Sequence, residues 1–308
     1  MQRISLAIIG LGKIATDQHV PCVRRGADFE IVATASRNAR LDGVENFTTL
    51  EELLAARPDV QAVALCVPPR PRYALAKSAL LAGKHVLLEK PPGATVSEVQ
   101  SLAALAVARD VSLFATWHSR YAAAVEAARR FLEPRAIRSV RIEWKEDVRH
   151  WHPGQQWIWE PGGLGVFDPG INALSILTEI LPSPVFLTAA GLEFPANRAT
   201  PIAASLTFGS EAGFPVEAVF DWRQTGPQTW DIVAETDDGI LRLSHGGTRL
   251  VIGEREIEIA EKPEYEALYD RFAALIRGGR QDVDLAPLQH VADAFLLGER
   301  TVVEPFED

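Results

Sequence analysis

The first third of the chain alternates between short apolar runs and longer stretches with the periodicity of amphipathic helices. The apolar runs predict five strands, at residues 4–9, 30–35, 60–67, 85–88 and 112–116. The stretches between them predict helices at residues 51–57, 74–82 and 96–109. Strands that alternate with helices form βαβ units and a parallel sheet. We therefore expect an α/β, Rossmann-type domain over residues 1–118, with a doubly wound parallel sheet of five or six strands.

The rest of the chain has a different pattern, in which strand-like segments follow one another with little helix between them. Candidate strands lie at residues 137–148, 185–194, 202–208, 216–222, 229–235, 240–244, 250–252 and 257–259. Helices are expected at residues 121–132, from about Asp168 onward, at 265–276 and at 288–297. This order predicts an α+β domain over residues 119–308 with a predominantly antiparallel open sheet.

Composition narrows the class of protein. The 308 residues, 47% of them hydrophobic, are enough for two domains with buried cores. A net charge of −10 and a pI near 5.3 disfavour a surface for nucleic-acid phosphates. No apolar run approaches the roughly 20 residues of a membrane span, and Cys22 and Cys66, the only cysteines, fit a reducing compartment. We expect a cytoplasmic protein whose partners include neither nucleic acid nor a membrane.

Charge is divided unevenly between the two expected domains. Residues 1–118 carry 13 Lys or Arg and 11 Asp or Glu, a net charge of +2. The remaining residues carry 18 and 30, a net charge of −12. The first domain is therefore the better host for a polyanionic cofactor, and the second suits a neutral or cationic substrate.

A glycine-rich turn follows the first expected strand. It contains Gly10, Gly12, Lys13 and Ile14, with Ala15 where a third small residue is needed. The first glycine allows a tight turn, the second lets the backbone approach a pyrophosphate, and Ala15 keeps the next helix close to the strand. The helix N-terminus then faces the anion. A glycine-rich turn without a ligand is the alternative, but the βαβ pattern favours dinucleotide binding.

The end of the second expected strand bears on the choice of cofactor. An acidic residue there would bind the ribose 2′-hydroxyl of NAD, but the chain has Ser36 and Arg37 instead. Arg37 supplies a planar cation for a 2′-phosphate and Ser36 a hydroxyl donor, so the sequence favours NADP, with NAD still possible. Alternatively, Arg37 is an ordinary solvated loop residue.

Two motifs in the first domain resemble a known family. They are Val67-Pro68-Pro69 and, about one βαβ unit later, Glu89-Lys90-Pro91-Pro92. Both are similar to motifs of the Gfo/Idh/MocA oxidoreductases, whose members have an N-terminal Rossmann domain and a C-terminal open-sheet domain. The resemblance implies that these residues border the cofactor, and that the chain forms a homo-oligomer through the open face of its second sheet.

Four longer runs, rich in rare residue types, resemble the bacterial aldose 1-dehydrogenases of this family, which act on D-galactose and L-arabinose. They are Thr116 to Arg120, Trp144 to Val148, Trp151 to Gln155 and Gly165 to Leu174. The resemblance implies oxidation of an aldose at C1 to the aldonolactone, with hydride transfer to the nicotinamide. It places Lys90 on the substrate oxygen, with Asp168 and Asn172 completing the site.

The spacing of Asp168 and Asn172 supports this arrangement independently. Asp168 precedes Pro169, a favoured first helical residue, so Asn172 lies at i+4 on the same helix face. Many family members have His where this chain has Asn172, and an amide cannot accept the proton. Asp168 is therefore expected to be the base, with Lys90 polarising the oxygen. A helix N-cap is the alternative, or an additional, role for Asp168.

Several side chains are candidates for binding the sugar. Five of the seven tryptophans fall between residues 117 and 159, and indole faces suit the C–H faces of a sugar ring, although core packing would equally explain any one of them. We expect four residues around the ring, His118 and Glu146 from the resemblance, Trp151 and Trp230 from their aromatic character. A metal site made by Glu146, Asp147, His150 and His152 is disfavoured because hydride chemistry needs no metal.

These observations predict an NADP-preferring dehydrogenase whose partner is a small-molecule aldose. Two alternatives remain open. One is another oxidation by the same family, of inositol or of a dihydrodiol. The other is a catalytically silent regulator that senses the nucleotide, against which the joint presence of Lys90, Asp168 and Asn172 argues.

Overall fold

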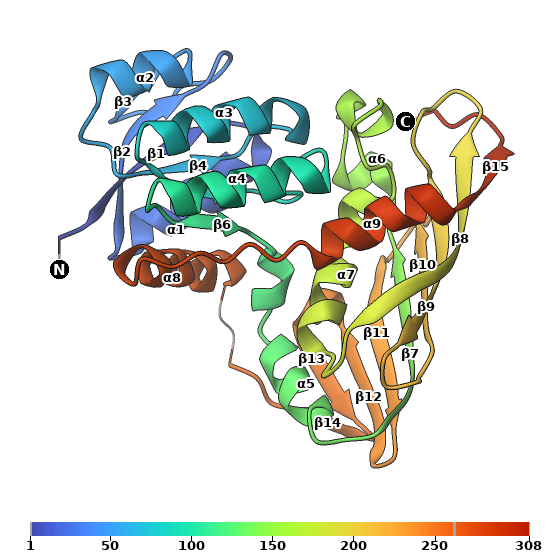
Figure 1. Cartoon of the computed structure of the whole chain (residues 1–308). Helices are drawn as coiled ribbons and strands as arrows, with labels where there is room; N and C mark the ends of the chain where they lie inside the picture. The colour runs from blue at the N-terminus through green and yellow to red at the C-terminus, as the bar shows by residue number, and fades with distance from the viewer. Residues whose placement is uncertain (1, 261–262, 308) are drawn as a thin grey trace. The chain divides into compact units, whose positions relative to one another are not determined.

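The five apolar runs of the first third and one further short strand, β3, form a six-stranded, fully parallel sheet in the computed structural model (Figure 1). Its strand order is β3-β2-β1-β4-β5-β6, the doubly wound order that was expected. Side chains of the central strands are buried on both faces, which explains why these strands have no polar alternation. The strands are β1 (Ile4–Ile9), β2 (Phe29–Ala35), β3 (Glu45–Phe47), β4 (Ala62–Leu65), β5 (His85–Leu88) and β6 (Leu113–Ala115).

The chain divides into two units, and the structure describes residues 2–260 and 263–307 of them. Unit 1 comprises residues 1–118 and 263–285, and unit 2 comprises residues 119–262 and 286–308. The chain thus leaves unit 1 after His118 and returns to it for residues 263–285, whereas the sequence analysis assigned all of residues 119–308 to the second domain. The sequence pattern gave no sign of this return, because the helix at 264–277 has the same amphipathic character whichever unit it covers.

Helices cover both faces of the parallel sheet. Leu53, Leu80 and Leu102 from three helices share one core on one face. Two of these helices begin with a capping box, Thr49 with Glu52 and Thr95 with Glu98, which satisfies their first N–H groups. The helices of this unit are α1 (Val20–Arg25), α2 (Leu50–Ala56), α3 (Pro69–Leu81), α4 (Val96–Ala108) and α8 (Glu264–Arg277).

Aromatic packing explains why α8 belongs to unit 1. The ring of Phe272 stacks on Phe29 of β2, with centroids 5.5 Å apart, and on Phe114 of β6 at 6.1 Å. All three side chains are buried. After α8, the backbone of Asp282 pairs with β6 next to Phe114. Residues 263–285 therefore complete the core and the edge of a sheet begun by the N-terminal segment.

Unit 2 is built on a nine-stranded, predominantly antiparallel sheet, the α+β arrangement that was expected. Its order is β14-β13-β12-β11-β7-β10-β9-β8-β15, and only β7/β10 and β8/β15 pair in parallel. The final strand was not anticipated. The strands are β7 (Ile137–Lys145), β8 (Val185–Pro195), β9 (Ala203–Ser210), β10 (Val216–Asp221), β11 (Thr229–Thr236), β12 (Gly239–Ser244), β13 (Arg249–Ile252), β14 (Arg255–Ile257) and β15 (Glu299–Val303).

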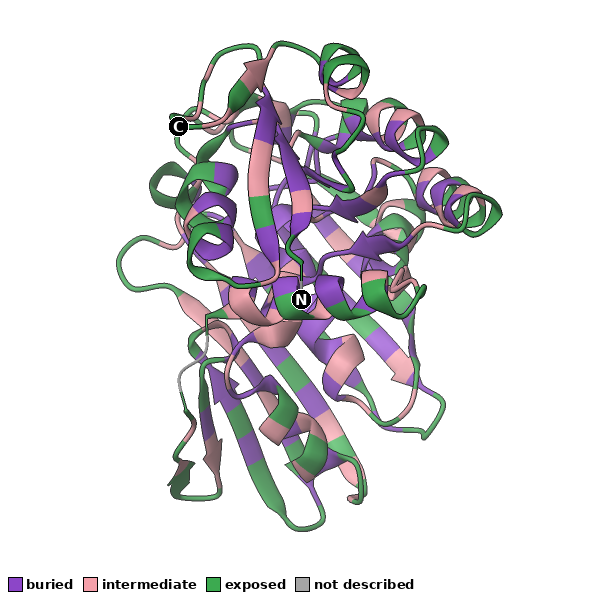
Figure 2. Cartoon of the chain, turned by 90° about the vertical axis from the view of Figure 1, so that its left-hand side faces the viewer, coloured by how far each residue is buried: buried purple, intermediate pink, exposed green. Residues whose placement is uncertain are grey.

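Helices cover one face of this sheet, and α7 is the most deeply buried of them. Gly170 lets α7 approach β10 closely, because a Cβ at this position would lie 2.7 Å from the ring of Phe220. Figure 2 shows the alternation of buried and exposed positions along the strands, which is typical of a sheet with one covered face. The helices are α5 (Val125–Leu132), α6 (Val148–Trp151), α7 (Phe167–Ile180) and α9 (Ala286–Leu297).

No helix within the described residues is both long enough and apolar enough to cross a membrane.

Candidate functional site

The glycine-rich turn after β1 has the geometry that dinucleotide binding needs. Gly10 has φ +90°, and a Cβ there would lie 2.8 Å from the Val67 side chain and 3.2 Å from the Cys66 carbonyl group. Gly10 is therefore required by both conformation and space. At Gly12 a Cβ would meet nothing within 4 Å, so this side of the turn is open. Such an opening suits the close approach of a phosphate group.

The residues after this turn begin a helix that is irregular in its first part. Residues Ala15–His19 are π-helical and continue directly into α1, and the amide of Thr16 donates to the Gly12 carbonyl at 3.1 Å. Lys13 and Ile14 are exposed, and Lys13 pairs with Asp17. The amides of the first turn point away from the helix and can meet an anion.

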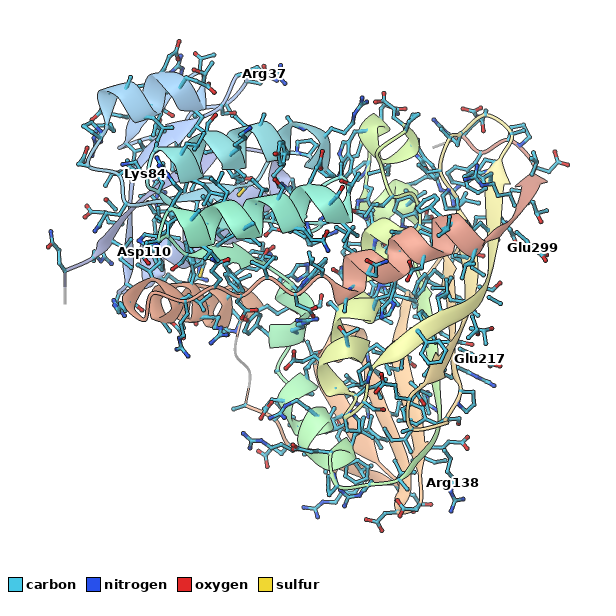
Figure 3. All side chains as sticks on the ribbon, in the orientation of Figure 1. Arg37, Lys84, Asp110, Arg138, Glu217 and Glu299 are labelled. Carbon is cyan, nitrogen blue, oxygen red and sulfur yellow. The ribbon has the colours of Figure 1, made fainter. Side chains whose placement is uncertain are left out.

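The end of β2 carries no carboxylate. The Ser36 amide donates to the Phe47 carbonyl of β3 at 3.0 Å, which fixes the strand end. Arg37 is exposed and extends outward from this edge of unit 1 (Figure 3).

A buried arginine holds the two motifs after β4 and β5 together. Arg72 on α3 donates to the carbonyl groups of Val67, Glu89 and Pro91. These strands are neighbours in the sheet, so the ends that carry Val67-Pro68-Pro69 and Glu89-Lys90 lie side by side. The sequence reasoning missed Arg72, because nothing in its sequence surroundings marks it as buried.

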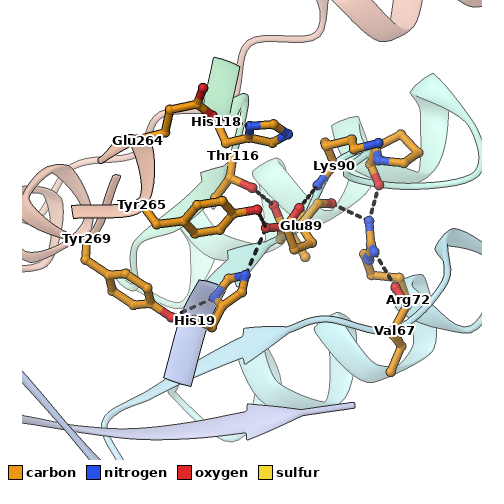
Figure 4. Close-up of polar contacts among 12 residues, drawn as sticks. His19, Val67, Arg72, Glu89, Lys90, Thr116, His118, Glu264, Tyr265 and Tyr269 are labelled. Atoms are coloured by element: carbon orange, nitrogen blue, oxygen red, sulfur yellow. Dashed lines mark hydrogen bonds and ion pairs between the residues drawn. The ribbon is translucent and has the colours of Figure 1, made fainter. Parts of the chain in front are cut away.

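The Glu89 side chain is the centre of a buried polar cluster (Figure 4). Its Oε1 accepts from His19 Nε2 at 2.9 Å and from the Tyr265 hydroxyl at 2.8 Å, while Oε2 accepts from the Lys90 amide at 2.8 Å. The other nitrogen of His19, Nδ1, lies 2.8 Å from the Tyr269 hydroxyl oxygen. We call these four side chains, of His19, Glu89, Tyr265 and Tyr269, the Glu89 cluster. It joins the helix after the glycine-rich turn, the strand end before Lys90, and α8.

The Glu89 cluster contains charge that is shielded from water. Burial raises the pKa of the Glu89 carboxyl, but the hydrogen bond and charge of His19 outweigh burial and lower that pKa to about 2. Burial likewise opposes the charged form of His19, but neighbouring Cys66, Tyr269 and Glu89 hold its pKa well above the usual value. Burial and the adjacent carboxylate raise the pKa of Tyr265. The cluster is thus an ion pair with two neutral phenols.

His118, a predicted sugar-binding residue, lies at the end of the N-terminal segment of unit 1. Its Nδ1 lies 2.6 Å from Glu264 Oε2, and its ring stacks on Tyr265 with centroids 5.6 Å apart. The preceding Trp117 is buried, and its indole donates to the Asp284 carbonyl at 3.0 Å. Contacts to the returning segment therefore fix the position of His118.

In unit 2, α7 carries Asp168 and Asn172 one turn apart, with Asp168 3% exposed. The helix-cap interpretation of Asp168 is wrong. The helix begins at Phe167 with Val166 as N-cap, and Asp168 lies inside the first turn. The helical turns begin earlier than the Asp168-Pro169 pair suggested. Gly165 adopts φ +55°, and its carbonyl group accepts a hydrogen bond from the Asp168 amide at 2.8 Å.

A second buried carboxylate, Glu146, follows β7 in unit 2. Its Oε1 accepts from the Trp222 indole at 3.3 Å and its Oε2 from the Trp230 indole at 2.9 Å. Trp151, 37% exposed, packs on Trp230 with ring centroids 5.1 Å apart. Three of the predicted sugar-binding residues, Glu146, Trp151 and Trp230, are therefore neighbours.

His152 lies between the carboxylates of unit 2. Its Nε2 is 3.4 Å from Glu146 Oε1, and its Nδ1 is 3.6 Å from Asp168 Oδ2. The sequence had drawn attention to this histidine only as part of a disfavoured metal site. Two other members of that set point elsewhere, since Asp147 binds Arg149 and His150 is exposed. Among the described residues, no three His, Cys, Asp or Glu side chains gather as metal ligands would.

The predicted site residues thus fall into two groups, each described within its own unit. The cofactor candidates, Lys90 and His118 belong to unit 1, and Asp168, Asn172, Glu146, Trp151 and Trp230 belong to unit 2. Sequence reasoning missed Arg72 and the histidine and tyrosines of the Glu89 cluster, and gave His152 no role in the reaction.

Comparison with known proteins identifies relatives of the whole chain. Residues 4–116 match a model described as an oxidoreductase family with an NAD-binding Rossmann fold, Gfo/Idh/MocA. Galactose 1-dehydrogenase of Pseudomonas fluorescens is 48% identical over 100% of both chains. Trans-1,2-dihydrobenzene-1,2-diol dehydrogenase of Bos taurus is 29% identical over 50% of this chain and 48% of its own.

Solved structures agree with the fold. The crystal structure of D-galactose-1-dehydrogenase from Rhizobium etli is 60% identical, has a TM-score of 0.96, and covers 100% of this chain and 99% of its own. KijD10, a 3-ketoreductase from Actinomadura kijaniata solved with NADP, is 19% identical with a TM-score of 0.84, covering 98% and 100%. At 19% identity, the similarity to KijD10 shows a shared fold only.

Proposed function

The chain belongs to the Gfo/Idh/MocA oxidoreductase family, and we propose that it oxidises C1 of an aldose, D-galactose above all, to the aldonolactone. The observation that carries the proposal is the likeness to galactose 1-dehydrogenase over the full length of both chains. The cluster of Glu146 with two indole donors supports it, because a carboxylate beside aromatic faces suits a polyhydroxylated ring.

The cofactor is a nicotinamide dinucleotide, which accepts the hydride when bound. Gly10 and Gly12 form a turn with an open side for its pyrophosphate, and the amides of Lys13 and Ile14 follow. The strand ends held by Arg72, with Val67-Pro68-Pro69 and Glu89-Lys90, border the same edge of the sheet. The glycine-rich turn and these two strand ends therefore fit a nicotinamide dinucleotide.

We propose a preference for NADP over NAD. Arg37 is exposed at the end of β2, where it can pair with a 2′-phosphate, and Ser36 adds a hydroxyl group. A carboxylate at this strand end would bind the 2′-hydroxyl of NAD and repel the phosphate, and the strand end has none. The ratio of kcat/KM for the two cofactors tests this proposal.

Three side chains perform the proton chemistry in this proposal. Asp168 removes the proton of the anomeric hydroxyl, which is more acidic than that of an ordinary alcohol. Lys90 donates to the same oxygen and stabilises its developing negative charge. The Asn172 amide can donate to the substrate and orient it, but cannot accept the proton.

The sugar ring is bound, in this proposal, by His118, Glu146, Trp151 and Trp230. D-galactose and L-arabinose have the same arrangement at C2, C3 and C4 of their pyranose rings, and arabinose lacks only the hydroxymethyl group. Polar groups that bind O2, O3 and O4 should therefore accept both sugars, whereas D-glucose inverts C4 and leaves one buried polar group without a partner.

A panel of aldoses with NADP and with NAD, followed by the absorbance of the reduced nicotinamide, tests the proposed function. Oxidation of D-galactose supports it. Oxidation of inositol or of a dihydrodiol instead would assign a different reaction of the family. Absence of turnover with every substrate, combined with nucleotide binding, would indicate a regulator.

Two further properties belong to the proposal. We place the enzyme in the cytoplasm, supported by two buried free cysteines. We also propose a homo-oligomer that pairs through the uncovered face of the unit 2 sheet, where Val219 is exposed. Glu217 is exposed on the same strand (Figure 3). Light scattering of the purified protein tests the second statement.

A further inference from the structure

The environment of His152 suggests a role that the proposed reaction does not yet use. Its ring lies between two carboxylates that are each 3% exposed, those of Glu146 and Asp168. No other charged side chain of unit 2 has a described contact with the ring. The ring is held in place, because the His152 amide donates to the Val148 carbonyl at 2.8 Å and the ring packs on Trp222 at 5.3 Å.

The two ring nitrogens are not equivalent. Nδ1 is buried and has no hydrogen-bond partner, although Asp168 Oδ2 is only 3.6 Å away. A protonated Nδ1 beside a carboxylate would form a charge-assisted hydrogen bond of about 2.7–2.9 Å. Two lone pairs that face each other stay farther apart. At this separation Nδ1 makes no hydrogen bond to Asp168, so its lone pair is available to accept one when the ring proton is on Nε2, toward Glu146.

This arrangement is complementary to the protonated form of Asp168. Once Asp168 has gained a proton, its O–H can donate to the lone pair of Nδ1, which has no other partner. Transfer of that proton to Nδ1 would return Asp168 to its carboxylate form. The side chain of His152 is 16% exposed, compared with 5% for that of Asp168, so the proton moves toward solvent.

We propose that His152 receives the substrate proton from Asp168, an inference that rests on the proposed aldose oxidation. The anomeric O–H bond breaks and an Asp168 O–H bond forms, while the C1–H bond pair leaves as hydride to the nicotinamide and C1=O forms. The Asp168 O–H bond then breaks and a His152 Nδ1–H bond forms, which restores the carboxylate. In this role His152 acts through Asp168, so it is a positioning residue that also carries a proton.

Three variants test this role in the intact enzyme. His152→Gln retains hydrogen-bonding groups but cannot take up the proton, and His152→Ala leaves space for free imidazole. His150→Gln is the matched control, because His150 is a near neighbour on α6 that is exposed and contacts the Trp151 ring. That contact can alter KM, so the control is judged by kcat and by its response to imidazole.

The expected kcat of His152→Gln is about 10- to 100-fold below wild type, with KM for D-galactose changed less than about 3-fold. Imidazole should raise kcat of His152→Ala several-fold and leave His150→Gln unchanged. A second measurement needs neither cofactor nor sugar. The ¹⁵N spectrum of histidine side chains, with His152 assigned by its loss in His152→Gln, should show an unprotonated Nδ1 at neutral pH.

The outcomes separate this role from the proposed function. If the wild-type enzyme oxidises no aldose, the proposed function fails, and the proton relay fails with it. If the wild type is active but His152→Gln retains its kcat, or imidazole does not restore His152→Ala, only the relay is overturned. A ¹⁵N signal from a protonated Nδ1 in the free enzyme also overturns it, because that nitrogen could not then accept the proton.

Discussion

The Glu89 cluster predicts a large effect for the substitution Glu89→Gln, which replaces one carboxylate oxygen with an NH₂ group. The amide has the size of the carboxylate but no charge, and one of its two ends becomes a donor. In the wild type, Oε1 of Glu89 accepts from His19 and Tyr265, and Oε2 accepts from the Lys90 amide. Whichever way the amide turns, its NH₂ group faces a donor, and the charged His19 loses its counter-ion.

Two routes give a similar magnitude for the loss of stability. The pKa of Glu89 is about 2, compared with 4.5 for an ordinary glutamate. At 1.36 kcal/mol per pKa unit, this difference corresponds to about 3 kcal/mol. Breaking a buried ion pair by removing one partner typically costs about 3–5 kcal/mol. We expect Glu89→Gln to lower the free energy of unfolding of unit 1 by about 3 kcal/mol at pH 7.

The pH dependence provides a more specific signature. The folded-state pKa of Glu89 lies below its ordinary value, so its stabilising contribution is complete above about pH 4.5 and is lost as pH falls toward 2. The wild type should lose stability across this window, and the difference from Glu89→Gln should shrink. His19 has the opposite sign, since its pKa is raised and its contribution is lost as pH rises through the folded-state pKa.

Hydrogen exchange measured by mass spectrometry reports unit 1 separately, through peptides that cover β5 and α8. Glu45→Gln is the matched control, because the Glu45 side chain is 59% exposed and pairs with Arg57 on the surface of the same unit. Surface pairs of this kind contribute about 0–1 kcal/mol. Equal protection in Glu89→Gln and Glu45→Gln at pH 7 would refute the assignment of a buried ion pair to the Glu89 cluster.

Three further predictions concern the proposed reaction. Arg37→Ala should raise KM for NADP roughly 10-fold and leave KM for NAD unchanged, because only NADP loses a charge-assisted hydrogen bond; equal losses in initial-rate assays with both cofactors would contradict the assignment. Asp168→Asn should lower kcat about 100-fold or more with little change in melting temperature, since Asp168 does not cap α7; full activity would move the base elsewhere. D-glucose should have a kcat/KM several orders of magnitude below that of D-galactose, and L-arabinose within about 200-fold; comparable values for the two hexoses would exclude recognition of O4.

The sequence predicted those helices and strands whose hydrophobic pattern lies within one short stretch of the chain. The apolar run before Gly10 was predicted as a buried strand, and the close contacts at Gly10 explain why the turn after it needs a glycine. The helices at residues 51–57 and 96–109 were predicted from amphipathic periodicity, and in the structure each begins with a capping box, Thr49 with Glu52 and Thr95 with Glu98. The three-residue β3 has too few positions for any periodicity, and it was missed.

Contacts between residues far apart in the sequence could not be predicted from the hydrophobic pattern. Tyr265 lies 176 residues from Glu89, and nothing near either residue indicates the other. Asp-Pro suggested a capping position at Asp168, but the preceding turn, set by the conformation of Gly165, made the helix start earlier. His150 and His152 are two residues apart in the sequence, and only the folded chain distinguishes the partly buried His152 from the exposed His150.

The divided sequence of unit 1 has a consequence for synthesis on the ribosome. The first 118 residues emerge with all six strands of their sheet, but Phe29 and Phe114 have no Phe272 to cover them until α8 has been translated. The His19 and Glu89 side chains meanwhile lack both phenols. An N-terminal domain usually folds first during translation. Here the last helix of unit 1 is translated only after residues 119–262. Unit 1 therefore cannot complete its core until most of unit 2 has been synthesised.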